Sequence, residues 1–222
     1  MINAILFDFD GTLLNRDESV KKFITNQYDR LHQWVGHVPK ETYVARFIEL
    51  DKRGYVWKDK VYQQLTRECQ ITGLTWEALL KDYLHEFKHH CVPYDGLIQM
   101  LERLKSRNIL LGIISNGFGQ FQLDNIKALG IAEYFNVILI SEWEGIKKPN
   151  PKIFNRALKK LNVSSSQTIF VGDHPENDVY AAQHVGITGI WKKDLQWDNV
   201  QADYTIQQLG ELPQIITNLN EQ

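Results

Sequence analysis

The chain begins with a short apolar run that ends in two acids. Residues 4–9 are apolar and β-prone apart from Asp8, and the pair Gly11-Thr12 interrupts the pattern directly after Asp10. A run of this kind is typical of a strand buried on both faces, and it places the two acids at the carboxyl end of that strand. Ligands bind at this edge in open α/β sheets. The stretch therefore predicts a site at the end of the first strand.

Strand and helix patterns alternate from residue 93 to the end of the chain. We expect strands at residues 110–115, 137–140, 168–171, 187–191 and 204–206. We expect helices at residues 97–104, 120–129, 151–161, 176–184 and 210–219. Such alternation favours an α/β fold with a doubly wound parallel sheet.

Between the first strand and this alternating region, the sequence carries helical patterns and no strand pattern. We expect helices at residues 18–34, 39–51, 57–69 and 75–90, with breaks at intervening glycines. Asn15 can cap the first of these helices. The pattern predicts an all-helical domain of residues 15–92, inserted into an α/β core made of residues 1–14 and 93–222.

Composition limits the partners and the compartment. The 222 residues, 43% of them hydrophobic, are enough for one large domain or two smaller ones with a sizeable core. A formal charge of −2 gives no strong field, so we expect neither nucleic acid nor an anionic membrane as partner. With no signal-like start, no apolar stretch of membrane-spanning length and two cysteines outside any Cys-x-x-Cys pattern, the expected location is cytoplasmic. The sequence does not predict the oligomeric state.

Two carboxylates as close as those of Asp8 and Asp10 repel each other unless a positive charge offsets them. Mg²⁺ does this well, because it prefers carboxylate and carbonyl oxygens. A solvated acidic turn is an equally good interpretation of an isolated Asp-x-Asp. A separate segment, His89-His90-Cys91, resembles a metal site in composition, but three consecutive residues at a helix end rarely converge on one ion, and we reject it.

Three further polar segments follow predicted strands. In chain order they are Ser115-Asn116-Gly117, Lys147-Lys148-Pro149 and residues 172–178 (Gly-Asp-His-Pro-Glu-Asn-Asp). Together with the first motif, they resemble the four motifs of the haloacid dehalogenase (HAD) superfamily, in its phosphatase-like subgroup with a small helical cap. The resemblance covers nearly the whole chain. It implies a Rossmann-like core, an inserted cap that closes over the site, and Mg²⁺-dependent hydrolysis of the phosphate monoester of a small metabolite.

The resemblance also implies roles for the acids. Asp8 would be the nucleophile that becomes an aspartyl-phosphate, and Asp10 the general acid and later the base for water. The implied metal ligands are Asp8, Asp10 through its backbone carbonyl, Asp173 and Asp178. For Asp178, two alternatives stay open: direct coordination of the metal, or orientation of a nearby lysine.

The remaining motif residues are implied to bind the phosphate. Ser115, Asn116 and Gly11 would contact its oxygens, with Lys148 screening the negative charge. We choose Lys148 over Lys147 because the functional lysine of the family directly precedes the proline. An ordinary Ser-Asn-Gly turn is the alternative for the second motif.

Other functions compete with a phosphatase. A phosphomutase of sugar phosphates would have a similar motif set and cap. A haloacid dehalogenase would use the same nucleophile without Mg²⁺, although dehalogenating relatives generally lack an acid at the position of Asp10. A non-catalytic binding protein of the same fold would be expected to lack one of the motif residues. The sequence does not identify the phosphorylated substrate.

Overall fold

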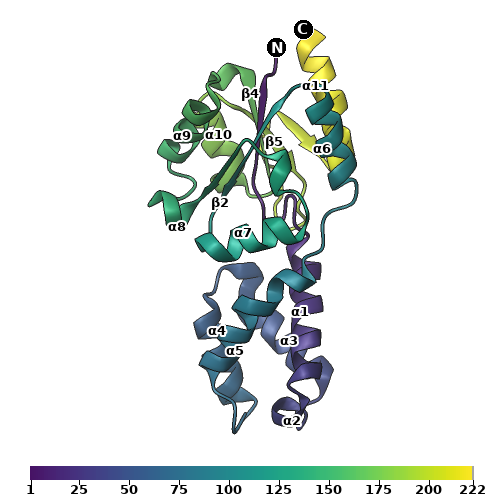
Figure 1. Ribbon diagram of the computed structural model, residues 1–222, viewed down its shortest axis with the longest axis vertical. Helices are drawn as coiled ribbons and strands as arrows, with labels where there is room; N and C mark the ends of the chain where they lie inside the picture. Colours follow the sequence, from purple (N-terminus) through teal and green to yellow (C-terminus); the bar gives the residue numbers. More distant parts are fainter. Residues whose placement is uncertain (222) are drawn as a thin grey trace. The chain divides into compact units, whose positions relative to one another are not determined.

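The computed structural model describes residues 1–221, and the chain divides into two compact units (Figure 1). One unit combines residues 1–15 with the chain from Pro93 onward. The other consists of Arg16–Val92 and is entirely helical. In the described part of the chain, no helix is both long enough and apolar enough to span a bilayer.

A parallel sheet organises the first unit. Its strands are β1 (Ala4–Phe7), β2 (Leu110–Ser115), β3 (Val137–Ile140), β4 (Thr168–Gly172), β5 (Thr188–Lys192) and β6 (Tyr204–Ile206). They lie side by side in the order β3-β2-β1-β4-β5-β6, and every neighbouring pair is parallel. The predicted doubly wound sheet is therefore confirmed. The chain changes direction across the sheet between β1 and β4, and this switch point is where such folds bind ligands.

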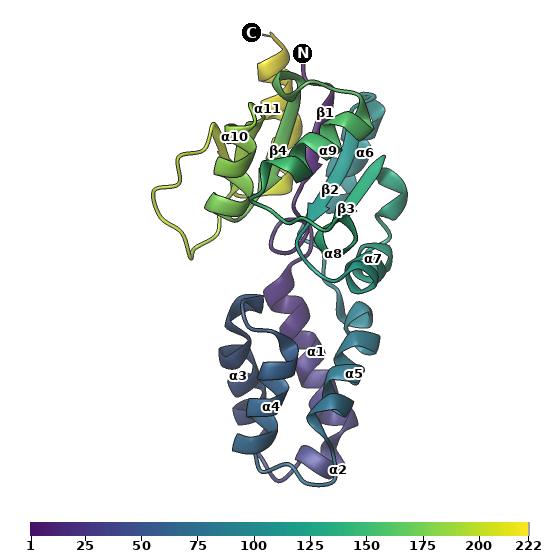
Figure 2. The same ribbon diagram turned by 90° about the vertical axis from the view of Figure 1, so that its left-hand side faces the viewer.

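Helices cover both faces of the sheet (Figures 1 and 2). The α-helices of this unit are α6 (Leu97–Ser106), α7 (Gly119–Ala128), α8 (Ser141–Glu144), α9 (Pro151–Leu161), α10 (Ala181–His184) and α11 (Leu212–Glu221). On one face, α9 and α10 pack against apolar side chains of the strands, including Leu6 and Phe170. On the other face lie α6 and α11, which contact each other. The central strands are thus buried on both sides, which is why β1 to β4 consist mainly of apolar residues.

Capping and spacing explain the position of α9. The side chain of Asn150 accepts a hydrogen bond from the Lys152 amide, and Pro151 occupies the first turn, where its missing N–H costs nothing. One face of the helix is then buried through side chains at helical spacing, namely Ile153, Phe154, Ala157, Leu158 and Leu161.

The second unit has an aromatic core. Its helices are α1 (Arg16–Arg30), α2 (His32–Val35), α3 (Lys40–Asp51), α4 (Lys58–Glu68) and α5 (Trp76–Glu86), followed by a 3-10 turn, η2 (Phe87–His90). The rings of Phe23 and Tyr83 meet edge to face, with centroids 5.1 Å apart. Buried Gln27 donates to the Leu79 carbonyl at 3.3 Å and accepts from the Tyr62 hydroxyl at 3.0 Å, which links α1, α4 and α5.

Several predicted elements have different bounds in the structure: the helix expected at residues 75–90 ends at Glu86, and the helix expected at residues 176–184 is a π-helix at Pro175–Tyr180 followed by α10. Two further differences have a clear local cause. β1 ends at Phe7 rather than at residue 9, because the Phe9 carbonyl accepts the amides of residues 12–14 and starts a turn. The helix expected at residues 18–34 is broken at Leu31, whose φ of −105° and ψ of 15° lie outside the α-helical range. The chain then folds back so that the Tyr28 hydroxyl donates to the Val38 carbonyl at 2.7 Å.

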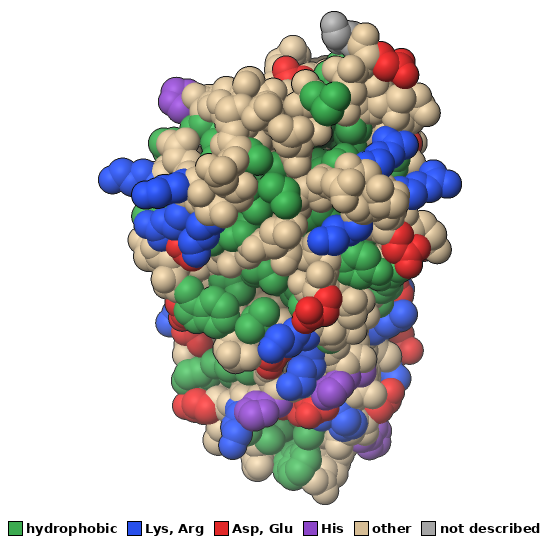
Figure 3. Space-filling model, turned by 45° about the horizontal axis from the view of Figure 1, so that its top comes forward, with side chains coloured by type: hydrophobic (Ala, Val, Ile, Leu, Met, Phe, Trp, Pro, Cys, Tyr) green, Lys and Arg blue, Asp and Glu red, His purple; other side chains and the backbone are tan. Residues whose placement is uncertain are grey.

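The surface carries charges of both signs. Basic and acidic side chains lie among hydrophobic and uncharged ones on the face drawn in Figure 3. This mixture follows from the near balance of 25 basic and 27 acidic residues in the sequence.

Candidate active site

The turn after β1 shapes the candidate site. The Asp8 amide donates to the Val171 carbonyl at 2.9 Å, so Asp8 still follows the line of the sheet. Gly11 then adopts a φ of +86°, and a Cβ atom there would lie 2.3 Å from a carboxylate oxygen of Asp173. Only glycine meets both conditions without strain. The turn therefore brings its backbone directly against the acid that follows β4.

Lys148 lies between two carboxylates. Its Nζ is 2.6 Å from Oδ1 of Asp8 and 2.6 Å from Oδ1 of Asp178, and its side chain is 2% exposed. Burial alone would lower the pKa of Lys148, but the attraction of Asp178 and Asp8 outweighs it and raises the pKa. Lys147 is exposed. Of the two adjacent lysines, the structure therefore places Lys148 beside Asp8.

Two acids of the site, Asp8 and Asp173, have raised pKa values. Burial raises the pKa of Asp8 to about 6, against the opposing effect of Lys148 and with a further rise from Asp178. Burial likewise raises the pKa of Asp173 well above its usual value, and the charges of Asp8 and Asp178 add to the rise. Burial and the mutual repulsion of the acids therefore both disfavour their charged forms, and a bound cation would favour those forms.

These acids are close enough to share one ion. Among the described residues, Asp8, Asp173 and Asp178 form the one group of three potential ligand side chains whose ligand atoms all lie within 4.8 Å of one another. Asp178 already has two partners, since its Oδ1 meets Lys148 and its Oδ2 accepts the His174 amide at 3.0 Å. The group offers the carboxylate oxygens that Mg²⁺ prefers. The Asp10 side chain lies outside this group.

The second motif occupies the carboxyl end of β2. Ser115 is buried, and its Oγ accepts a hydrogen bond from Nε2 of Gln122 at 2.8 Å. The Asn116 amide makes a reciprocal pair of bonds with the backbone of Lys148: Nδ2 donates to the Lys148 carbonyl at 3.0 Å, and Oδ1 accepts the Lys148 N–H at 2.9 Å. Asn116 thus holds the backbone from which the lysine extends, directly before the cis Lys148–Pro149 bond.

Three residues of the site, Thr12, Gln122 and Lys192, are not among those that the sequence predicts. The Thr12 hydroxyl donates to Oδ2 of Asp8 at 3.3 Å, and Gln122 donates to Oδ2 of Asp10 at 2.5 Å. Lys192 is buried, donates to the Gly11 carbonyl at 3.1 Å and lies 3.3 Å from the centroid of the Tyr94 ring. Thr12 lies within the first motif and was within reach of sequence reasoning. Gln122 and Lys192 contact the motif from segments that carry no motif of their own.

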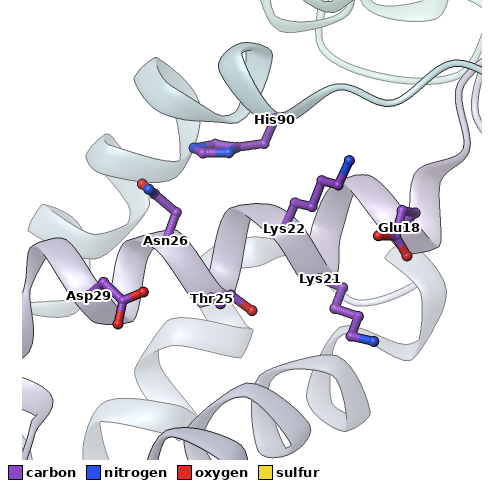
Figure 4. Close-up of a pocket in the computed structure, with 7 residues that line it drawn as sticks. All are labelled: Glu18, Lys21, Lys22, Thr25, Asn26, Asp29 and His90. Carbon is purple, nitrogen blue, oxygen red and sulfur yellow. The ribbon is translucent and has the colours of Figure 1, made fainter.

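The helical unit has an open pocket of about 370 Å³ (Figure 4). Six of the seven lining residues belong to α1, and His90 comes from η2. All seven are half-buried or exposed, namely Glu18, Lys21, Lys22, Thr25, Asn26, Asp29 and His90. Their polar groups are accessible to water, so this pocket lacks the buried charged groups that distinguish the cluster around Asp8.

Known proteins resemble this chain along nearly its whole length. A model of the haloacid dehalogenase-like hydrolase family matches residues 5–192. The glyceraldehyde 3-phosphate phosphatase of Pyrococcus furiosus is 30% identical, over 99% of this chain and 95% of the relative. The phosphoglycolate phosphatase of Neisseria meningitidis is also 30% identical, over 100% and 95%. The crystal structure of a HAD phosphatase from Thermococcus onnurineus superimposes with a TM-score of 0.68 at 29% identity, covering 97% of this chain and 98% of that one.

Proposed function

Because the chain belongs to the haloacid dehalogenase-like hydrolase family, we propose that it is a Mg²⁺-dependent phosphatase of a small phosphorylated metabolite. One observation carries the proposal: buried Asp8 is paired with buried Lys148 and lies beside Asp173 and Asp178, in a cluster whose carboxylate oxygens could share one cation. The names of the relatives, which are phosphatases of glyceraldehyde 3-phosphate and phosphoglycolate, favour a substrate with a short carbon chain.

In the first half of the proposed reaction, a carboxylate oxygen of Asp8 attacks the phosphorus of the substrate. A bond forms between that oxygen and phosphorus while the bond from phosphorus to the ester oxygen breaks. Asp10 gives a proton to the ester oxygen, which leaves as an alcohol. Lys148 holds Asp8 in its anionic form, and the Ser115 hydroxyl donates to a phosphoryl oxygen.

In the second half, the aspartyl-phosphate at Asp8 is hydrolysed. Asp10, now a carboxylate, takes a proton from a water molecule whose oxygen attacks phosphorus. The bond between Asp8 and phosphorus breaks, inorganic phosphate leaves, and the protonated Asp10 is ready for another substrate. The two halves balance, because the proton lost to the alcohol is regained from water.

The donor set fits Mg²⁺. We propose Asp8, Asp173 and the backbone carbonyl of Asp10 as its protein ligands, since the carboxylate oxygens of both acids lie within 4.8 Å of each other. Asp178 would orient Lys148, because both of its oxygens already have partners. When bound, Mg²⁺ would offset the combined negative charge of the acids and the phosphate.

We assign substrate selection to the helical unit, Arg16–Val92, in the role of the cap. This unit has a compact core of its own, which supports the assignment. Residues on its surface can change without disturbing the acids around Asp8. The exposed aromatic side chains Tyr55 and Trp57, 59% and 62% exposed, are candidates for such a variable surface.

Phosphate release from a panel of phosphorylated metabolites tests the proposal. With Mg²⁺, we expect release from one group of substrates, loss on adding a chelator, and recovery with excess Mg²⁺. Asp8→Asn removes the nucleophile, so turnover should fall by at least about 10⁴-fold, whereas Asp198→Asn, at an exposed position, should leave it unchanged. Unchanged turnover in Asp8→Asn would refute the proposal. Halide release that a chelator does not inhibit would favour a dehalogenase over a phosphatase. Interconversion of sugar phosphates would favour a mutase.

A further inference from the structure

Gln122 lies between two residues with different roles in the proposed reaction. It extends from α7 and is 3% exposed. Its Nε2 is 2.5 Å from Oδ2 of Asp10 and 2.8 Å from Oγ of Ser115. A side-chain amide nitrogen has two hydrogens, so Gln122 can donate to both residues at once. One buried side chain thus contacts both the proposed proton donor and the proposed phosphate ligand.

The chemistry of the three groups determines how the amide is oriented. If the amide were turned over, its oxygen would face a carboxylate oxygen of Asp10, and two acceptors would repel each other. With the nitrogen toward Asp10, Oδ2 accepts a hydrogen bond, and the proton transferred to the leaving group belongs on Oδ1. Because Ser115 Oγ accepts from Gln122, the hydroxyl hydrogen of Ser115 points elsewhere and can be donated to a phosphoryl oxygen.

The surroundings of Gln122 leave its side chain little freedom, and the amide is held through its nitrogen. A Cβ atom at Gly117 would lie 2.8 Å from Cγ and 2.9 Å from Nε2 of Gln122, so the second motif leaves room for the side chain only with glycine there. The Gln122 Oε1 atom is buried and has no hydrogen-bond partner among the described atoms. The two hydrogen bonds of Nε2, to Asp10 and Ser115, are therefore the side-chain contacts that orient this amide.

We propose that Gln122 is a positioning residue for the reaction. It holds Asp10 with Oδ1 directed at the leaving-group oxygen and turns the Ser115 hydroxyl toward the phosphoryl group. The inference rests on the proposed phosphatase function and deepens it, because it adds a residue outside the four motifs.

The dependence of rate on the leaving group tests this role. An alkyl phosphate needs a proton on its departing oxygen, whereas the nitrophenolate of p-nitrophenyl phosphate departs without one. The value of kcat/KM reports phosphoryl transfer to Asp8 and not the later hydrolysis. In Gln122→Met, which keeps the bulk of the side chain, we expect kcat/KM to fall about 100-fold for the alkyl phosphate and less than about tenfold for p-nitrophenyl phosphate.

Controls separate positioning from folding. Gln120→Met alters an exposed residue of the same helix whose Nε2 donates to Asp124, and it should leave both substrates unaffected. Gly117→Ala keeps the Gln122 side chain but displaces it from Asp10 and Ser115. This variant should therefore show the same selective fall in kcat/KM for the alkyl phosphate. In Asp10→Asn, kcat/KM should fall more for the alkyl phosphate than for p-nitrophenyl phosphate. The double variant Asp10→Asn with Gln122→Met should show little further selective loss.

The outcomes are distinguishable. Equal losses for both substrates in Gln122→Met, with wild-type hydrolysis intact, would overturn the positioning role and leave the phosphatase function standing. If the wild-type protein hydrolysed neither substrate in an Asp8-dependent way, the proposed function would fail, and this inference with it. A selective loss that matches Asp10→Asn would establish the role, and thermal melting would show that the variant remains folded.

Discussion

At the scale of single residues, the positive charge of Lys148 offsets the negative charges of the acids around it. It is buried between Asp8 and Asp178, while Lys147, its neighbour in sequence, is exposed. The positive charge of Lys148 attracts both carboxylates, and its removal would leave the two acids to repel each other.

The two lysines provide a matched pair of variants. Lys148→Met should reduce kcat/KM about 10³-fold, because the nucleophile loses the charge that keeps it anionic and the phosphate loses a cation. Lys147→Met should change it by less than about twofold, because that side chain is solvated. Steady-state kinetics of the two variants provide the check, and similar effects in both would contradict the assignment of Lys148.

The raised pKa values of the acids predict how metal binding depends on pH. With the pKa of Asp8 at about 6 and that of Asp173 also raised, the metal-free site holds protons near pH 6 that a cation must displace. Calorimetry in two buffers of different ionisation enthalpy should therefore show proton release on Mg²⁺ binding at pH 6. The release should diminish, and the affinity should rise, as the pH increases. Affinity that does not vary with pH would mean that these acids are not ligands.

At the scale of elements, the sequence predicts the strands of the sheet well and the residues at which they end less well. Strands β2, β3 and β4 are mainly apolar runs, so their place and type follow from local pattern. The end of β1 does not, because Phe9 is apolar and buried like the strand itself. Its backbone carbonyl ends the strand by accepting amides of residues 12–14.

The candidate site shows the same limit. The motif residues could be predicted because acids, hydroxyls and a lysine follow apolar strands in a familiar order. Lys192 could not, since it is 181 residues from Gly11 and no local pattern marks a buried cation there. Gln122 lies on a helix with weak apolar patterning, and its contact with Asp10 depends on the packing of α7. Tertiary contacts of this kind leave no periodic trace in a sequence.

Gln27 provides a prediction for the packing of the helices in the second unit. Gln27→Ala removes the partner of the Leu79 carbonyl and the Tyr62 hydroxyl and leaves a cavity, so the free energy of unfolding should fall by about 2–3 kcal/mol. Gln33→Ala, at an exposed position in α2, should cost less than about 0.5 kcal/mol. Denaturant unfolding measures both values. Equal losses would mean that the Gln27 hydrogen bonds do not hold the helices together.

At the scale of the whole molecule, the chain combines a site built at one sheet edge with a helical unit that has its own core. All four motifs belong to the α/β unit, although the insertion of Arg16–Val92 separates the first motif from the other three. In our proposal, the chemistry belongs to the sheet edge and the choice of substrate to the insertion. The near-neutral charge of the protein fits this view, because the anionic substrate would be captured by local groups rather than by a long-range field.

The most direct test of the account is chemical trapping of the proposed aspartyl-phosphate. Borohydride, added by rapid quench during turnover of p-nitrophenyl phosphate, reduces an acyl phosphate to an alcohol and so converts the modified aspartate to homoserine. Peptide mass spectrometry should locate this change at Asp8, dependent on substrate and Mg²⁺ and absent from Asp8→Asn. Modification at a different acid, or sustained hydrolysis by Asp8→Asn, would contradict the assignment of Asp8 as the nucleophile.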